Sequence, residues 1–250
     1  MKLPEQVSQL GFVGERKAVA LLFLGFFATV FTLMGFLASS QLPEWTAAFF
    51  GLGACYGIGF FAVAADWFWG RWFAVGLGNS GLMMAVMALV ATREILPQMV
   101  VFGAMHGLIT LCLLGEKMAA VYEARPDWRQ RFKLDEGGVV RVKHSVTRAA
   151  TSLPSLILWA LAPRDGAGMA LLAVGVVGMV GLLRGRTWGV LAVASAGAAA
   201  VVSALAVTSH ASAATPLPGL WAPTFGVLAG GLLLLSALPF ARPIAAFLRR

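Results

Sequence analysis

Long apolar segments alternate with short polar segments along nearly the whole chain. Most of them are long enough for a helix that crosses the ~30 Å hydrocarbon layer of a bilayer, because an α-helix rises ~1.5 Å per residue. The pattern therefore predicts an all-α fold, a polytopic transmembrane helical bundle of about eight spans. In chain order, the apolar segments are 18–38, 47–65, 73–91, 99–115, 149–162, 167–183, 187–207 and 222–240.

The distribution of Lys and Arg favours all eight spans. The weakest apolar segment is 149–162, which is short and contains Pro154. If it spans, only Arg93 and Arg164 of the 19 Lys and Arg residues fall on the second side of the membrane, whereas a re-entrant loop there would leave six on that side. Short loops rich in Lys and Arg stay in the cytoplasm. We therefore expect both termini in the cytoplasm and a multi-pass protein of the cell membrane, most simply the bacterial inner membrane.

The composition indicates lipid rather than water as the main solvent. Hydrophobic residues make up 59% of the chain and charged residues only 12%, with a mean hydropathy of +0.83. A soluble domain carries about 25% charged residues. The net charge of +8 is accounted for by the topology signal together with attraction to anionic lipid. The expected partner is thus the lipid bilayer, and no nucleic-acid partner is expected.

The helices divide four and four around one sizeable connection. We expect a first four-helix membrane half at 1–115, a basic cytoplasmic loop at 116–148 and a second four-helix membrane half at 149–250. Helix four should continue through 116–124 and stop before Pro126. The alternating residues 140–143 fit either a hairpin strand or the amphipathic start of helix five. We favour the helix, because basic residues recur there on one helical face.

Two turns hold similar residues in matching places of the two halves. Arg71 and Trp72 follow a glycine in the first half, and Arg186 and Trp188 flank a similar turn in the second. The match fits either a parallel repeat or the ordinary anchoring of tight turns by Arg and Trp at the membrane interface. We favour anchoring, and place Trp72 in the aromatic belt with its neighbouring tryptophans.

The apolar segments contain no Asp, Glu, Lys or Arg, the residue types that mark ion and proton paths inside a membrane. One titratable group remains, His106 in helix four, with Thr110 one turn further along. A stable zinc site needs three or four ligands, and no second His lies in an apolar segment. We expect no metal and no cofactor, and interpret His106 as a neutral side chain bonded to a neighbouring helix.

A four-residue motif in helix three suggests a different chemistry. Gly78, Asn79, Ser80 and Gly81 resemble the GxSG nucleophile motif of the rhomboid intramembrane serine proteases. The resemblance implies a nucleophilic Ser80 activated by a histidine, and His106 lies at a similar depth. In rhomboids, however, the histidine lies two spans beyond the serine helix, whereas here it lies on the next span, and an oxyanion helix is missing. Close helix packing explains both glycines without catalysis.

Helix five carries a polar stripe. Arg148, Thr151, Ser152 and Ser155 recur at helical spacing on one face, and Pro154 frees a backbone carbonyl nearby. Such a face must contact protein or water rather than lipid. It could line a path for a small solute, or hydrogen-bond to neighbouring helices, which we favour.

Three classes of function fit the sequence. We favour an integral inner-membrane protein without a recognisable catalytic site, a membrane-embedded subunit or scaffold that docks a cytosolic or membrane protein partner, or anionic lipid, through loop 116–148. An alternative is a permease for a small neutral or anionic solute, lined by helices four and five. A second alternative is an intramembrane serine hydrolase that uses Ser80 and His106. The residues expected to bind the partner or lipid are Arg129, Arg131, Lys133, Arg141 and Lys143.

Overall fold

The computed structural model describes residues 5–123, 135–161, 166–208, 221–241 and 243. These residues form α-helices and two short 3-10 helices, with no strand among them, so the predicted all-α fold is confirmed. The elements are α1 (Glu5–Gln41), η1 (Pro43–Trp45), α2 (Thr46–Ala64), α3 (Gly70–Thr92), α4 (Pro97–Leu113), α5 (Glu116–Glu123), α7 (Glu136–Leu161), α8 (Gly166–Leu183), α9 (Thr187–Thr208), α10 (Trp221–Ala237) and η2 (Leu238–Phe240).

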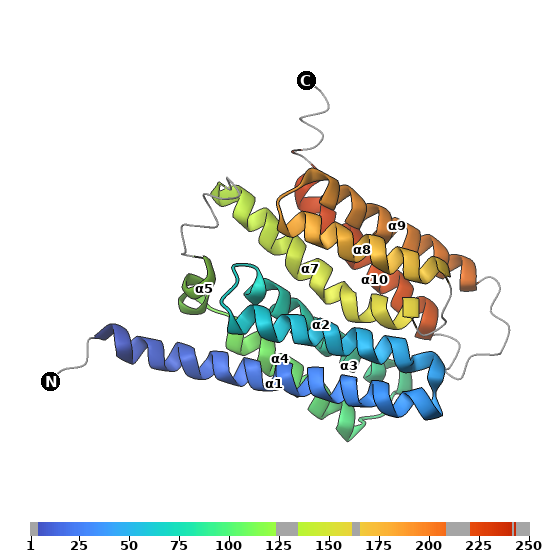
Figure 1. The fold of residues 1–250 in the computed structure, drawn as a ribbon, viewed down its shortest axis with the longest axis horizontal. Coiled ribbons are helices and arrows are strands. Elements are labelled where there is room, and N and C mark those ends of the chain that lie inside the picture. Colours follow the sequence, from blue (N-terminus) through green and yellow to red (C-terminus); the bar gives the residue numbers. More distant parts are fainter. Residues whose placement is uncertain (1–4, 124–134, 162–165, 209–220, 242, 244–250) are drawn as a thin grey trace.

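The long helices run alternately back and forth along one direction, and the short helix α5 lies at one end of them (Figure 1). In the first half, α1 packs against α2 and α4, and α3 packs against α4. In the second half, α9 packs against α8 and α10. Helix α7 contacts α2 and α3 on one side and α8 and α10 on the other, so it joins the two halves.

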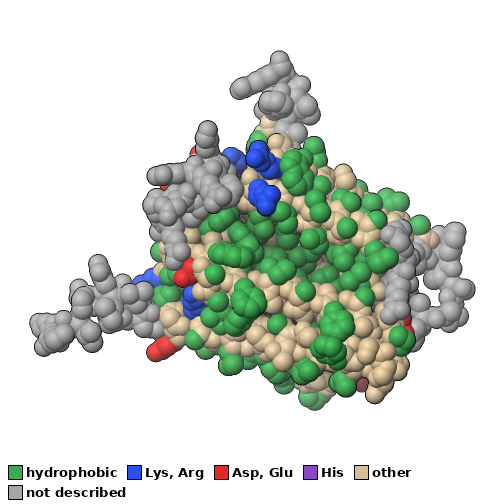
Figure 2. All heavy atoms as spheres, viewed as in Figure 1, with side chains coloured by type: hydrophobic (Ala, Val, Ile, Leu, Met, Phe, Trp, Pro, Cys, Tyr) green, Lys and Arg blue, Asp and Glu red, His purple; other side chains and the backbone are tan. Residues whose placement is uncertain are grey.

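The face of the bundle in Figure 2 exposes many apolar side chains. On α1, for example, Leu22, Phe36 and Leu37 are each more than half exposed. Water-soluble monomers rarely expose large contiguous apolar patches, whereas lipid is a good solvent for them. The bundle therefore has the surface and the apolar helices of a membrane-spanning protein.

Eight spans were expected from the apolar segments of the sequence. Fewer of the described helices are long and apolar enough to cross a membrane. Phe12–Gln41, Pro43–Ala64, Gly70–Val90 and Thr187–Ala206 are each long and apolar enough to cross a bilayer, and α4 with α5 adds a fifth if a pair of helices bent by 71° counts as one span. Helices α8 and α10 are apolar but shorter, and α7 begins with a charged stretch. The described helices thus support four or five spans on this ground, against the expected eight.

Basic side chains gather at one end of the bundle, where α1 and α7 begin. We call this the charged end. In the described part of the chain, Arg93 lies at the opposite end, after α3. The Lys and Arg residues at the charged end are Arg16, Lys17, Arg71, Lys117, Arg141, Lys143, Arg148, Arg184 and Arg186.

The predicted continuation of helix four through 116–124 is wrong. Helix α4 ends at Leu113, and α5 departs from it at an angle of 71°. Gly115 lies between them with a φ of +100°, a left-handed conformation that glycine adopts without steric cost. The chain therefore turns across the charged end instead of extending away from it.

Helix α7 decides between the hairpin strand and the amphipathic helix start that were considered for residues 140–143. Residues 140–143 are helical, so the preferred amphipathic start is confirmed and the hairpin is wrong. The short apolar segment is the second part of one continuous helix of 26 residues that contains Pro154. Every residue from Ala149 to Ile157 is buried, as expected for a helix surrounded by protein.

Candidate functional site

The polar centre of the first half is a hydrogen-bonded pair, His106 of α4 and Tyr56 of α2, both buried. The Nδ1 atom of His106 lies 2.8 Å from the carbonyl oxygen of Phe102, one turn back on α4. A carbonyl can only accept, so Nδ1 carries the proton. The other ring nitrogen, Nε2, then accepts from the Tyr56 hydroxyl at 2.7 Å. This arrangement is a neutral histidine bonded to a neighbouring helix.

Aromatic rings enclose the imidazole. The ring centroid of Phe27 lies 4.1 Å from that of His106, and the centroid of Phe102 lies 4.2 Å away. The ring of Tyr56 contributes an edge-on contact at 5.7 Å. With both nitrogens bonded and three aromatic rings packed against it, the His106 side chain is fixed in position.

The two glycines of the GxSG motif make room for α4. A Cβ atom on Gly81 would lie 2.0 Å from Cδ2 of His106, and one on Gly78 would lie 2.3 Å from Oγ1 of Thr110. The Thr110 hydroxyl donates to Oδ1 of Asn79 at 3.3 Å. Packing between α3 and α4 thus accounts for Gly78 and Gly81 in this motif.

Ser80 does not form the pair that a serine nucleophile needs. Its side chain is fully buried, and its Oγ atom has no hydrogen-bond partner among the described residues. Both ring nitrogens of His106 are already bonded, to Tyr56 and Phe102. An activated nucleophile requires a hydrogen bond to its base, and the described contacts supply none.

The polar stripe of α7 is mostly satisfied by nearby backbone. Thr151 donates to the carbonyl of Thr147 at 2.8 Å, and Ser152 donates to that of Ala149 at 2.7 Å. Arg148 donates to the carbonyl of Leu235 near the end of α10 at 2.8 Å. Ser155 is buried, and its hydroxyl has no partner in the described part of the chain.

An apolar cavity of about 260 Å³ lies between α7, α10 and the first four helices. Tyr56 is the one lining residue with a hydroxyl, and that hydroxyl is bonded to His106. The other lining residues, among them Met84, Phe102 and Pro154, are apolar. Such a lining suits an apolar molecule and offers little to an ion or a polar solute.

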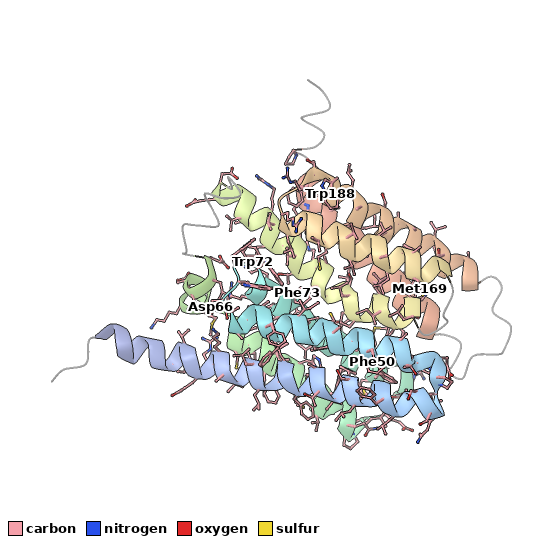
Figure 3. The ribbon with its side chains drawn as sticks, viewed as in Figure 1. Phe50, Asp66, Trp72, Phe73, Met169 and Trp188 are labelled. Carbon is pink, nitrogen blue, oxygen red and sulfur yellow. The ribbon has the colours of Figure 1, made fainter. Side chains whose placement is uncertain are left out.

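Glu123, at the end of α5, organises the charged end. Its Oε1 atom accepts from Nη1 of Arg71 at 2.6 Å and from the indole Nε1 of Trp72 at 2.8 Å. The ammonium of Lys143, on α7, lies 3.6 Å from the same oxygen. Arg71 also donates from Nε to the carbonyl of Leu113 at the end of α4. One carboxylate thus links α3, α5 and α7, and its partner Arg71 adds α4, with Trp72 beside α5 (Figure 3).

Further contacts fasten α1 and α5 to the same end. Met118 and Tyr122 of α5 are fully buried, and the Tyr122 hydroxyl donates to the carbonyl of Val63 at 3.3 Å. Arg16 of α1 donates to carbonyls in the last turn of α4. Lys17 forms an ion pair with Asp66 at 2.6 Å. Basic side chains at the carbonyl end of a helix stabilise it.

No known protein family, curated protein or solved structure matches this chain.

The predicted docking residues fall into two groups. Arg129, Arg131 and Lys133 lie outside the described residues. Arg141 and Lys143 lie on the first turns of α7, where each is partly exposed and paired with a carboxylate. The guanidinium of Arg141 lies 3.5 Å from Asp135, and Lys143 pairs with Glu123.

The sequence did not point to Tyr56 or Glu123, and it gave Arg71 a different role. Tyr56 lies in an apolar segment, where its hydroxyl needs a partner, and this signal could have linked it to His106. Arg71 and Trp72 were placed at the membrane interface, but they are 5% and 1% exposed, so the aromatic-belt position of Trp72 is wrong. Their partner, Glu123, lies on the bent helix α5 that the sequence did not predict.

The two similar turns have different surroundings. In the first half, Arg71 and Trp72 are buried against α5. In the second half, Arg186 and Trp188 are exposed, with Trp188 in the first turn of α9 (Figure 3). The shared residues therefore perform different structural roles.

Proposed function

We propose that this chain is a membrane-embedded subunit or scaffold that docks a cytosolic partner, or anionic lipid, through the basic segment 116–148. The observation that carries the proposal is that both helices next to residues 124–134, α5 before them and α7 after them, are anchored to the bundle. Glu123, at the end of α5, lies next to Lys143, near the start of α7. Both flanking helices bury apolar side chains against the bundle. Residues 124–134 thus connect two anchored helices, and the end of α5 contacts α7 at Lys143.

The charges of this segment suit recognition of an acidic surface. Residues 116–148 hold eight basic and five acidic residues. Charge complementarity sets partner choice and association rate more than raw affinity. Of the five residues expected to bind the partner, Arg141 and Lys143 already pair with carboxylates of this chain. Arg129, Arg131 and Lys133 are therefore the ones proposed to meet the partner.

The other two functions receive less support from the contacts. A permease path along α7 would need polar groups free to meet a solute, yet Thr151 and Ser152 bond to their own helix. The cavity beside α7 has an apolar lining. A serine hydrolase would need a hydrogen bond from Ser80 to a base, and both nitrogens of His106 are engaged elsewhere.

Charge reversal tests the docking role. Arg129→Glu, Arg131→Glu and Lys133→Glu together should leave membrane insertion intact, because Lys117, Arg125, Arg141, Lys143 and Arg148 still hold the segment in the cytoplasm. The variant should lose at least ten-fold of the protein that co-purifies with the chain in mild detergent, or of its binding to anionic vesicles. Rising salt should weaken both associations, since exposed charges are screened beyond ~8 Å at physiological ionic strength.

A variant within the membrane provides the matched control. Thr151→Val with Ser155→Ala removes two hydroxyls of the α7 stripe and leaves the basic segment unchanged. This control should retain the co-purified partner and the vesicle binding at the wild-type level. If it abolished both while the charge reversal had no effect, the functional site would lie inside the membrane and the docking role would be rejected.

A further inference from the structure

An apolar groove of about 430 Å³ runs along the surface between the two halves of the bundle. Its walls come from α2 and α8, and its floor from α7. At the charged end of the bundle, the groove is lined by the start of α3 and the residues just before it. Both walls pack against α7 but hardly touch each other. Every lining residue is apolar, aromatic, glycine or cysteine, and apolar side chains cover this face of the molecule (Figure 2).

The length of the groove matches one leaflet of a bilayer. On α8 the lining residues run from Leu172 to Leu183, which corresponds to roughly 16 Å at about 1.5 Å per residue. Half of a ~30 Å hydrocarbon layer is about 15 Å. Within a membrane, an empty groove of this kind would forfeit dispersion contacts. A hydrocarbon chain from the surrounding leaflet has the length and the chemistry to fill it.

Two tryptophans stand at the charged end of the groove. Trp67 and Trp69 line it there, with ring centroids 5.2 Å apart. Tryptophan prefers the level of the lipid headgroups. This end of the groove therefore lies where a lipid headgroup would sit, and the remaining lining lies at the depth of the acyl chains.

Two arginines follow immediately after the last lining residue. Arg184 and Arg186 succeed Leu183, and both are exposed. Neither forms an ion pair within the described part of the chain, unlike Arg141 and Lys143. Figure 2 shows Lys and Arg side chains gathered at one end of this apolar face. An unpaired guanidinium is well suited to bind phosphate, because its donors match the oxygens in pairs.

The backbone holds these arginines in a defined turn. Gly185 has a φ of +64°, the N–H of Gly185 bonds to the carbonyl of Leu182, and the N–H of Arg186 bonds to that of Gly181. This pattern is the Schellman ending of a helix. The guanidinium groups therefore start from a fixed backbone next to the groove.

We propose that the groove binds one acyl chain of an anionic phospholipid, with its phosphate held by Arg184 and Arg186. The apolar walls supply affinity for any lipid chain, and the unpaired arginines select an anionic headgroup. This lipid would fill the space between α2 and α8 and thereby join the two halves. The proposal goes beyond the docking role and depends on none of the residues of segment 116–148.

Native mass spectrometry of the full chain in detergent tests this proposal. Delipidated protein should bind one phosphatidylglycerol molecule more tightly than a phosphatidylcholine with the same chains. Arg184→Gln with Arg186→Gln should weaken phosphatidylglycerol binding at least ten-fold and bring it to the level of phosphatidylcholine. Arg93→Gln, at the opposite end of the bundle, should leave binding unchanged.

A groove-filling substitution separates the acyl-chain site from the headgroup site. Val176 lines the groove and is partly exposed, so Val176→Trp should displace both lipids. Val202→Trp is the matched control, because Val202 is 66% exposed on α9 and lies away from the groove. Equal lipid binding by the two tryptophan variants would overturn the proposal. The proposal would also be overturned if Val176→Trp converted a dimer of this chain to a monomer without loss of lipid. The occupant of the groove would then be a second copy of the chain.

Discussion

At the residue scale, most of the buried polar side chains in the described part of the chain bond to specific partners, with Ser80 and Ser155 as exceptions. His106 shows this most clearly. Its two nitrogens bond to Tyr56 and Phe102, and Gly81 leaves the space that its ring occupies. A catalytic histidine would need one nitrogen available to a substrate or nucleophile. The geometry of His106 is that of a structural connection between α2 and α4.

The close fit at Gly81 predicts a large effect of one methyl group. A Cβ at this position would lie 2.0 Å from the imidazole, and the ring cannot move away without breaking its bonds to Tyr56 and Phe102. Gly81→Ala should therefore destabilise the protein by about 1–3 kcal/mol, as overpacking does in well-filled cores. The midpoint of thermal unfolding in detergent measures this effect.

Gly57→Ala is the control for backbone effects. A Cβ at Gly57, in the interior of α2, meets no atom within 4 Å. Alanine should raise stability there by roughly 0.5–1 kcal/mol, because it restricts the unfolded chain and favours helix. If Gly81→Ala were as stable as Gly57→Ala, the packing between α3 and α4 would differ from the one described.

At the element scale, α5 is the structural feature that distinguishes the charged end. It is only eight residues long, too short to be stable as an isolated helix. Its position depends on two buried side chains, Met118 and Tyr122, and on the bonds that Glu123 accepts. The basic segment that follows is therefore anchored through Glu123.

Removal of this carboxylate should release α5. Glu123→Ala leaves the guanidinium of Arg71 without its ion-pair partner, and losing one member of a largely buried pair costs on the order of 3 kcal/mol. We expect a lower unfolding midpoint and faster limited proteolysis within segment 116–148. Glu116→Ala, in the exposed first turn of the same helix, should leave both measurements unchanged. Equal effects of the two substitutions would show that Glu123 does not anchor α5.

The sequence predicted the long helices well and the charged end poorly. Apolar periodicity is local, so it located the apolar segments that became α1 to α4 and α8 to α10. The bend after α4 depends on Gly115 and on the docking of Met118 and Tyr122, which are contacts between distant parts of the chain. Likewise, Arg71 had the pattern of an interfacial residue, and only the fold brings Glu123 and Leu113 to it.

The candidate site was partly predicted. His106 was expected to bond to a neighbouring helix, and its partner, Tyr56, is now identified. The stripe on α7 was expected to bond between helices. Arg148 does so, to the carbonyl of Leu235 on α10, whereas Thr151 and Ser152 bond within their own helix. Side-chain hydroxyls of this kind have two competing acceptors, the helix backbone and the neighbouring helix, and spacing along the sequence does not decide between them.

At the scale of the whole molecule, the two halves meet along α7, and the charge is concentrated at one end. The docking role requires that this end face the cytoplasm. The described charges fit that orientation, because Lys and Arg lie almost entirely at the charged end. Short loops rich in Lys and Arg stay in the cytoplasm. The orientation of the bundle is thus the central claim on which the proposed function depends.

Labelling of single cysteines in intact cells tests this claim most directly. In a chain carrying Cys55→Ala and Cys112→Ala, the exposed positions Glu94, Lys117 and Arg184 are changed to cysteine one at a time. A membrane-impermeant maleimide should label Glu94→Cys from outside, and should label Lys117→Cys and Arg184→Cys only after permeabilisation. Labelling of Lys117→Cys in intact cells would place segment 116–148 outside the cytoplasm and contradict the proposed docking role.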